Sequence, residues 1–408
     1  MKFIDSSITA PRGISAAGIS CGIKGSGKKD LCLLQVSGLG LAAAVYTQNQ
    51  VKGHSLKRSL GLSRSGGRFH AVVINSGNAN ACVGPQGDAD AREMADAAAE
   101  KLGIRADEVL TCSTGVIGER LPMNRLISGI DEAAALLSHD IDAGHDACEA
   151  IMTTDTVRKE AVVEIEIGGK PVTVAGMAKG SGMIHPNMAT MIAVITTDCI
   201  ADQDFLDRSL RETVNKTFNR VSVDGDTSVC DTAILISSGL ASNEPIGFEQ
   251  DKSLNEEART FVRALEAVCM KLARSIAADG EGAGKLIDVR VDGAPDAETA
   301  KQVALSVARS PLVKTAMFGE DPNWGRILTA VGYAPVEIQP ERVDIALGHL
   351  TVCRGGAAAE YDEKEAEDIL ARDEIIIHID LNAGSFSDHY WTCDFSYDYI
   401  KINGSYRS

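Results

Sequence analysis

Hydrophobic side chains recur at helical spacing most clearly just past the middle of the chain. One stretch places them three or four residues apart on a single face, at Phe261, Leu265, Val268, Leu272 and Ile276. An Asp279-Gly280 pair follows, as is typical where a helix ends, so the pattern predicts a helix there. Similar patterns predict helices over residues 88–102, 124–137 and 296–308, with Pro295 just before or in the first turn of the last.

Short runs rich in β-branched residues lie between these stretches and predict strands. They cover residues 71–74, 162–167, 172–174, 192–197, 286–291, 343–347 and 375–379. Gly168-Gly169 separates two of the runs and predicts a hairpin turn. Because strands and helices mix without strict alternation, we expect an α/β (α+β) fold built in layers and not a doubly wound sheet.

Length and composition narrow the class of protein. A chain of 408 residues predicts two or three structural units, and 44% hydrophobic with only 4% aromatic residues predicts an aliphatic, Ala-rich core. The net charge of -17 repels phosphate backbones, so we expect no nucleic-acid partner. No run approaches the ~20 apolar residues of a membrane helix, and the first residues lack a signal-peptide core. We therefore expect a cytoplasmic protein with no membrane contact.

The cysteines and histidines do not form a recognisable metal-binding pattern. Ten cysteines are scattered without a C-x-x-C pair, which favours reduced, mostly buried thiols. Eight histidines lack paired ligand spacing, so we expect no metal. His185 is interpreted as a loop residue with local hydrogen bonds.

Two motifs near the start of the chain match known patterns only in part. Residues 22–29 nearly form a phosphate-binding loop, but Lys29 replaces the required Ser or Thr and a strand follows at residues 31–34. A hairpin loop is the better interpretation. Ser20 lies in a nucleophile-elbow pattern, but no helix can begin in this Gly-rich and Lys-rich stretch.

A different segment carries candidate chemistry. Residues 179–195 run from a Gly-rich loop through Pro186 into an apolar strand that begins at Thr190. Such a junction can hold a strained peptide bond, and the small Ala189 leaves its carbonyl open to attack by the Thr190 hydroxyl. Cleavage there would give Thr190 a free α-amine with an ordinary pKa of ~7.7 to 8.0, suited to a general base. The alternative is a plain loop that leads into a core strand.

This segment resembles the processing site of the ornithine acetyltransferase family, whose bifunctional members are also glutamate N-acetyltransferases. Further resemblances run in the expected order over essentially the whole chain. They lie at residues 9–18, 74–82, 113–118, 152–156, 222–228, 280–282, 318–326 and 399–403.

The resemblance implies a role for individual residues. Thr190 would be the nucleophile after cleavage between Ala189 and Thr190, and Thr114 with Gly115 would form the oxyanion hole. The implied substrate-binding residues are Thr153, Lys179, Thr190, Glu281, Asn403 and Ser408. Taken without the family, Lys179 would be an exposed loop lysine, Glu281 a helix-end carboxylate, and residues 113–115 an ordinary polar turn.

The sequence departs from the family pattern in two places. Val229 and Cys230 stand where a hydroxyl and an amide residue are usual, and the tail reads Gly404-Ser405 after Asn403. Both leave the implied nucleophile untouched, but they put the C-terminal contacts in question.

The implied reaction moves an acetyl group from N2-acetylornithine to glutamate by a ping-pong route through acetyl-Thr190. It needs no metal or organic cofactor, and use of acetyl-CoA as a co-substrate stays open. The resemblance further implies a layered α/β sandwich with central sheets flanked by helices, the self-processing fold of a Thr nucleophile. The α chain would be 1–189 and the β chain 190–408, with two of each in the assembly, and the remaining partners would be small amino-acid substrates.

Two alternatives remain. One is a self-processing amidase or aminopeptidase, in which water accepts the acyl group. The other is a non-catalytic binding protein whose chain stays intact.

Overall fold

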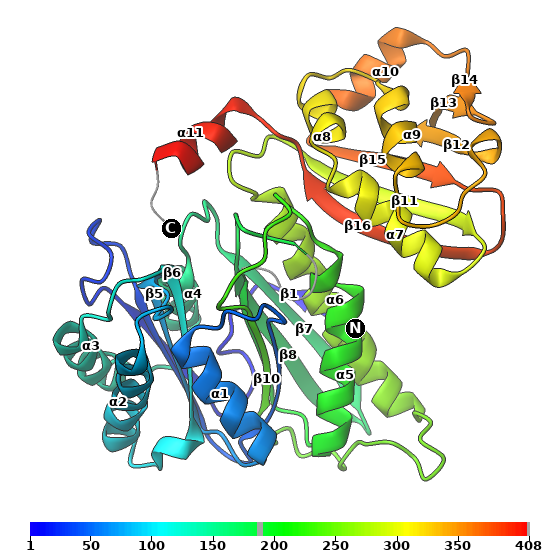
Figure 1. The fold of residues 1–408 in the computed structure, drawn as a ribbon. Helices are drawn as coiled ribbons and strands as arrows, with labels where there is room; N and C mark the ends of the chain where they lie inside the picture. Colours follow the sequence, from blue (N-terminus) through cyan, green and yellow to red (C-terminus); the bar gives the residue numbers. More distant parts are fainter. Residues whose placement is uncertain (186–190, 406–408) are drawn as a thin grey trace.

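Figure 1 shows the computed structural model, which describes residues 1–185 and 191–405. The implied cleavage site at Ala189-Thr190 and the implied contact Ser408 lie outside these residues. Within them the strands form three sheets, two in a sandwich and one in a C-terminal module.

The sandwich consists of a six-stranded and a four-stranded sheet. The first has the order β1-β7-β8-β9-β10-β4, with bounds Lys2–Ile4, Lys159–Ile167, Lys170–Lys179, Ile192–Thr197, Thr232–Ser237 and Leu41–Tyr46. The second has the order β2-β3-β5-β6, with bounds Ile14–Ile19, Leu31–Val36, Ala71–Asn78 and Val109–Val116. Strands β7 and β8 form a hairpin around Gly168-Gly169, where both residues have positive φ. The predicted turn is confirmed.

Successive side chains of each strand point to opposite faces of its sheet, so they enter two different cores. In β3, Cys32 and Leu34 belong to the core between the two sheets, whereas Leu31 and Leu33 belong to the core under the outer helices. In β9, Val194 lies in the inter-sheet core and its neighbours face the opposite helix layer. Both faces of these strands are therefore buried, as their continuous apolar runs require.

Helices cover the outer faces of both sheets (Figure 1). On the four-stranded sheet lie α1 (His54–Ser65), α2 (Pro85–Leu102) and α3 (Met123–Ala135). On the six-stranded sheet lie α5 (Gln203–Lys216) and α6 (Glu256–Ala278). Helix α4 (Ile141–Ile151) packs on β2 so closely that a Cβ at Gly18 would lie 1.9 Å from the Asp146 carbonyl oxygen. Only glycine fits in β2 at that contact.

The C-terminal module has its own sheet and its own core. The sheet order is β14-β13-β12-β15-β11-β16, with bounds Ala357–Ala358, Leu350–Arg354, Asp344–Leu347, Glu374–Asp380, Leu286–Ala294 and Phe386–Cys393. Its helices are α7 (Ala297–Ala308), α8 (Pro311–Phe318), α9 (Trp324–Gly332) and α10 (Glu363–Leu370). After β16 the chain returns toward the sandwich as α11 (Tyr397–Ser405), drawn in red in Figure 1.

The layered α/β fold expected from the sequence is confirmed, and the predicted helices and strands are all present within a few residues. The loop at residues 22–29 joins the antiparallel strands β2 and β3, so the hairpin interpretation is confirmed. Residues on both sides of position 190 share one sheet, because β9 pairs with β8 and β10 pairs with β4.

Three expectations from the sequence concern the cysteines, metal binding and membrane-spanning helices. All ten cysteines are free thiols, and eight of them are buried. No group of three or more His, Cys, Asp or Glu residues able to hold a metal ion occurs in 1–185 or 191–405. No helix in those ranges is long and apolar enough to cross a membrane.

Candidate active site

One small cavity collects every implied site residue that the structure describes. Its volume is about 70 Å³. Six of the residues that line it are implied site residues, namely Thr114, Gly115, Thr153, Lys179, Glu281 and Asn403. They come from β6, the segment after α4, the end of β8, the segment after α6, and α11. Residues far apart in the sequence thus meet at one end of the sandwich.

Thr114 and Gly115 lie where the pairing of β5 with β6 becomes irregular. Asn78 faces both Thr114 and Val116 there, which is a β-bulge. Gly115 has φ 131°, and a Cβ on it would lie 2.3 Å from the carbonyl carbon of Gly77. The bulge therefore requires glycine, and it turns this part of the strand toward the cavity. The site is more than the polar turn that residues 113–115 indicate in isolation.

Lys179 ends β8 and is only 2% exposed. It is not the exposed loop lysine that its sequence neighbours alone suggest. Burial lowers the pKa of its ammonium group, and the nearby Asp155 carboxylate acts in the opposite direction. Within 1–185 and 191–405 no hydrogen bond or ion pair engages its Nζ atom. A buried cation that lines a cavity in this way is suited to bind a carboxylate.

Asp155 joins three segments beneath the cavity, and sequence reasoning did not single it out. Its carboxylate accepts hydrogen bonds from the Thr153 amide at 2.9 Å, the Gly180 amide at 2.7 Å and the Lys159 ammonium at 2.7 Å. Burial would raise its pKa, but Lys159 and Lys179 outweigh that effect and hold the pKa at about 2. The signal for it was its place inside the family-like block 152–156.

Glu281 follows the end of α6 and supplies the carboxylate of the cavity. Its amide donates to the Ser181 carbonyl oxygen at 3.0 Å, and its carboxylate accepts from Asn403 Nδ2 at 2.8 Å. A Cβ on Gly182 would lie 2.3 Å from the Glu281 Cδ atom, so the Gly-rich loop passes directly over this carboxylate. A side chain at position 182 would therefore push the Glu281 carboxylate out of its present place.

The loop that leads toward residue 190 is held by the segment around Asp224. The Asp224 carboxylate accepts from the Met183 amide at 2.6 Å and from the Ile184 amide at 2.9 Å. His185 Nδ1 lies 3.1 Å from Ser222 Oγ, so His185 is a hydrogen-bonded loop residue, but this partner is distant in the sequence and not local as predicted. Burial lowers the pKa of His185, which favours the neutral ring. Residues 183–185 are thus held by hydrogen bonds to Asp224 and Ser222.

One of the two departures from the family pattern, at residues 229 and 230, forms part of the cavity wall. Val229 and Cys230 both line it, and the Cys230 thiol lies 3.5 Å from the Ala79 carbonyl oxygen. Burial raises the pKa of this thiol, so it stays protonated and unreactive. The wall at these two positions is apolar and offers the cavity no charge.

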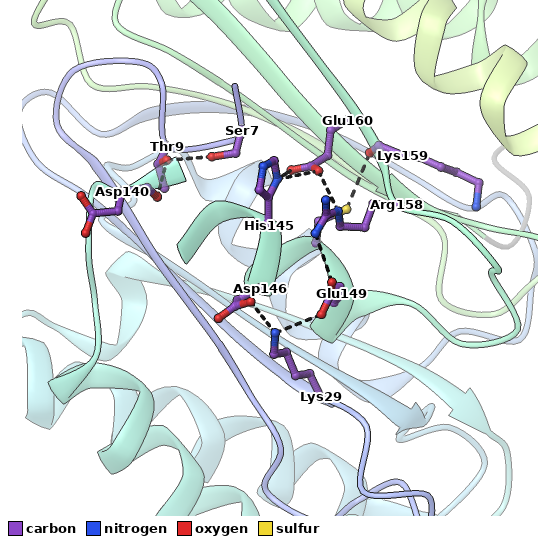
Figure 2. A network of polar contacts seen from close by, with 11 residues as sticks. Ser7, Thr9, Lys29, Asp140, His145, Asp146, Glu149, Arg158, Lys159 and Glu160 are labelled. Carbon is purple, nitrogen blue, oxygen red and sulfur yellow. Dashed lines mark hydrogen bonds and ion pairs between the residues drawn. The ribbon is translucent and has the colours of Figure 1, made fainter. Parts of the chain in front are cut away.

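Figure 2 shows the polar network that fixes α4, the helix that delivers Thr153. Lys29 from the β2-β3 hairpin contacts both Asp146 and Glu149 of α4. From β7, Glu160 accepts from His145 Nδ1 at 2.9 Å. The helix is therefore tied to both sheets just before the segment that enters the site.

Comparison with known proteins places the chain in a family. The model of a family described as ArgJ matches residues 15–408. The chain belongs to the ArgJ family. The arginine biosynthesis bifunctional protein ArgJ of Symbiobacterium thermophilum is 49% identical to it, and that of Caldanaerobacter subterraneus is 47% identical, each with 100% of both chains covered.

A solved relative gives the same result. The crystal structure of the arginine biosynthesis bifunctional protein ArgJ from Bacillus halodurans is 40% identical, with a TM-score of 0.50, and covers 52% of this chain and 98% of its own. The family resemblance drawn from the sequence is thereby confirmed, as is the expectation of an enzyme. The role of each site residue stays a prediction.

Proposed function

We propose that this ArgJ-family chain transfers the acetyl group of N2-acetylornithine to glutamate, with Thr190 as the nucleophile. The observation that carries the proposal is the cavity, where a buried cation, a carboxylate and the Thr114-Gly115 bulge meet beside the loop leading to residue 190. The names of the relatives, arginine biosynthesis bifunctional proteins, support an amino-acid substrate. The reaction would take place in the cytoplasm.

Maturation would begin with the hydroxyl of Thr190. Its oxygen adds to the carbonyl carbon of Ala189, the bond from that carbon to the Thr190 nitrogen breaks, and the nitrogen takes up a proton. Water then hydrolyses the resulting ester, which leaves a carboxylate on Ala189 and a free α-amine on Thr190. In the solved Bacillus halodurans relative, one chain spans about half of this one, as a product of such cleavage would.

Acetyl transfer would use the same hydroxyl. The α-amine takes the proton while the oxygen attacks the acetyl carbonyl, and the developing oxyanion is stabilised by the Thr114 hydroxyl and the Gly115 amide. Ornithine leaves as the amine after protonation, and an acetyl ester remains on Thr190. The amine of glutamate then attacks this ester, which regenerates the hydroxyl. If acetyl-CoA also serves as a donor, it would replace N2-acetylornithine in the first of these steps. No other cofactor takes part.

Charge would select an amino-acid substrate. Lys179 is placed to hold a substrate carboxylate and Glu281 to hold an amine, with Thr153 and Asn403 beside them. Both charged groups are nearly buried, so a substrate lacking either charge leaves one of them unpaired, which is costly. Ser408 and the contacts of Thr190 itself lie outside the described residues.

The two products would stay together after cleavage. Strand β9 pairs with β8 over six residue pairs and β10 pairs with β4 over another six, so the backbone hydrogen bonds of one sheet join both parts. We propose an assembly with two α and two β chains.

Mass spectrometry of the denatured protein tests the proposal, together with N-terminal sequencing of each fragment. Chains 1–189 and 190–408 are expected in place of one 43.1 kDa chain, and Thr190→Ala should remain uncut. Activity should yield N-acetylglutamate with parallel double-reciprocal lines. An active wild-type protein that remains in one piece would refute the mechanism. Acetate as the main product would instead indicate the amidase-like alternative.

A further inference from the structure

A buried carboxyl group holds the residue that directly follows position 190. Asp231 precedes β10, and its side chain is completely buried. Its Oδ1 atom accepts a hydrogen bond from the Met191 amide at 3.0 Å. The next residue, Thr232, donates its own amide to the Met191 carbonyl oxygen at 3.0 Å. Both sides of Met191 are thus fixed to the start of β10.

The backbone of Asp231 is itself fixed, because the Thr47 amide donates to its carbonyl oxygen at 3.0 Å. Thr47 directly follows β4, the strand on the far side of β10. The hydrogen bonds to Met191 therefore come from the start of a strand, β10, that is paired with β4 on one side and with β9 on the other. Such an anchor can hold a neighbouring group to within a fraction of an ångström.

The chemical state of this carboxyl group is unusual. Its second oxygen, Oδ2, is also buried, and the side chains of Ser228 and Thr47 lie near the carboxyl group. Burial raises the pKa of Asp231 well above its ordinary value, while the Met191 amide and the Lys179 ammonium group lower it. Burial also raises the pKa of the thiol of the preceding residue, Cys230, so this thiol carries no charge. The hydrogen bond from the Met191 amide to Oδ1 is the contact through which this carboxyl group acts on β9.

We propose that Asp231 is a positioning residue for Thr190: it accepts the hydrogen bond of the Met191 amide and so fixes the end of the strand segment to which residue 190 is joined. The proposal rests on the proposed nucleophilic role of Thr190. Position matters because misplacement of a reacting group by about 1 Å can slow a reaction about 100-fold.

Two substitutions test whether the hydrogen-bond acceptor at Asp231 is what positions residue 190. Asp231→Ala removes the acceptor for the Met191 amide, and we expect cleavage and turnover to slow about 10- to 100-fold, since displacement of a reacting group by about 1 Å has effects of that size. Asp231→Asn keeps an oxygen acceptor in a side chain of the same shape and should restore most of the loss. Cleavage is followed by mass spectrometry of chains made by cell-free translation, and turnover by initial rates over a pH series.

Asp198 provides a matched control at the opposite end of β9. It is 2% exposed, follows the strand directly, and accepts from the Thr173 amide at 2.8 Å through Oδ1. Asp198→Ala should lower stability to a similar extent as Asp231→Ala and yet mature at the wild-type rate. The comparison separates positioning from a general loss of stability.

Each outcome decides a separate claim. An uncut wild-type chain would refute the proposed function itself. With a cut wild type, equal rates for Asp231→Ala and wild type, or equal slowing by Asp231→Ala and Asp198→Ala, would overturn the positioning role alone. If Asp231→Asn is as slow as Asp231→Ala, the missing hydrogen-bond acceptor is not the cause of the loss and the positioning role is likewise overturned.

Discussion

Gly115→Ala is the substitution whose effect follows most directly from the geometry of the site. The added Cβ would lie 2.3 Å from the Gly77 carbonyl carbon and 2.6 Å from the Asn78 nitrogen. Both are backbone atoms, so no side chain can rotate to relieve the contact. The β5-β6 bulge has to open, and Thr114 has to move with it.

The magnitude has two parts. Ordinary contacts begin near 3.4 Å, so relief of a 2.3 Å contact requires a displacement of about 1 Å. A φ of 131° is strained for any residue with a Cβ, by about 1–3 kcal/mol, and the crowding adds about 1–3 kcal/mol. We therefore expect a loss of about 2–6 kcal/mol in the free energy of unfolding, a large part of the total of about 5–15 kcal/mol for a typical domain. Misplacement by about 1 Å should slow cleavage and turnover about 100-fold.

Gly118→Ala is the control, three residues further along. Gly118 has φ 84°, and a Cβ there meets no atom within 4 Å, so the variant has the strain without the clash. It should lose about 1–2 kcal/mol and mature normally. Urea unfolding gives the stabilities, and mass spectrometry of the cut and uncut chains gives maturation. A Gly115→Ala protein that matures at the wild-type rate would refute the oxyanion role of this bulge.

Two further predictions concern the charges beneath the cavity. Lys179→Met should lower kcat/KM for N2-acetylornithine about 10- to 100-fold through a loss of about 1.5–3 kcal/mol, without loss of thermal stability, because it removes a buried cation; unchanged kinetics would contradict the carboxylate role. Asp155 has a folded-state pKa of about 2, below its value of 3.8 in the unfolded chain, so its stabilisation is complete above about pH 4 and disappears as pH falls through about 2. That limb should carry about 2 kcal/mol in acid-unfolding curves and be absent in Asp155→Asn, and equal limbs in both proteins would show that the carboxylate is not the source.

Much of the local structure could be predicted from the sequence. The periodicity at 261–276 corresponds to α6, which ends at Ala278, and Gly168-Gly169 forms the β7-β8 turn. These features depend on near neighbours alone, namely helical spacing, strand alternation and glycine conformation. Helix α4 was not predicted, although it carries Thr153 to the site, because its apolar face packs into a contact with β2 that local spacing does not reveal.

The candidate active site shows what could not be predicted from local sequence. Motif order assigned Thr114, Lys179 and Glu281 to one function through resemblance, whereas the residues alone suggested a turn, an exposed lysine and a helix end. Only the tertiary structure decided that these three line one cavity and that Lys179 is buried there. It also revealed Asp155 and Asp231, whose importance depends on burial and on hydrogen bonds to distant segments. Local sequence determines which element forms, but long-range strand pairing and burial determine which charges meet and how they titrate.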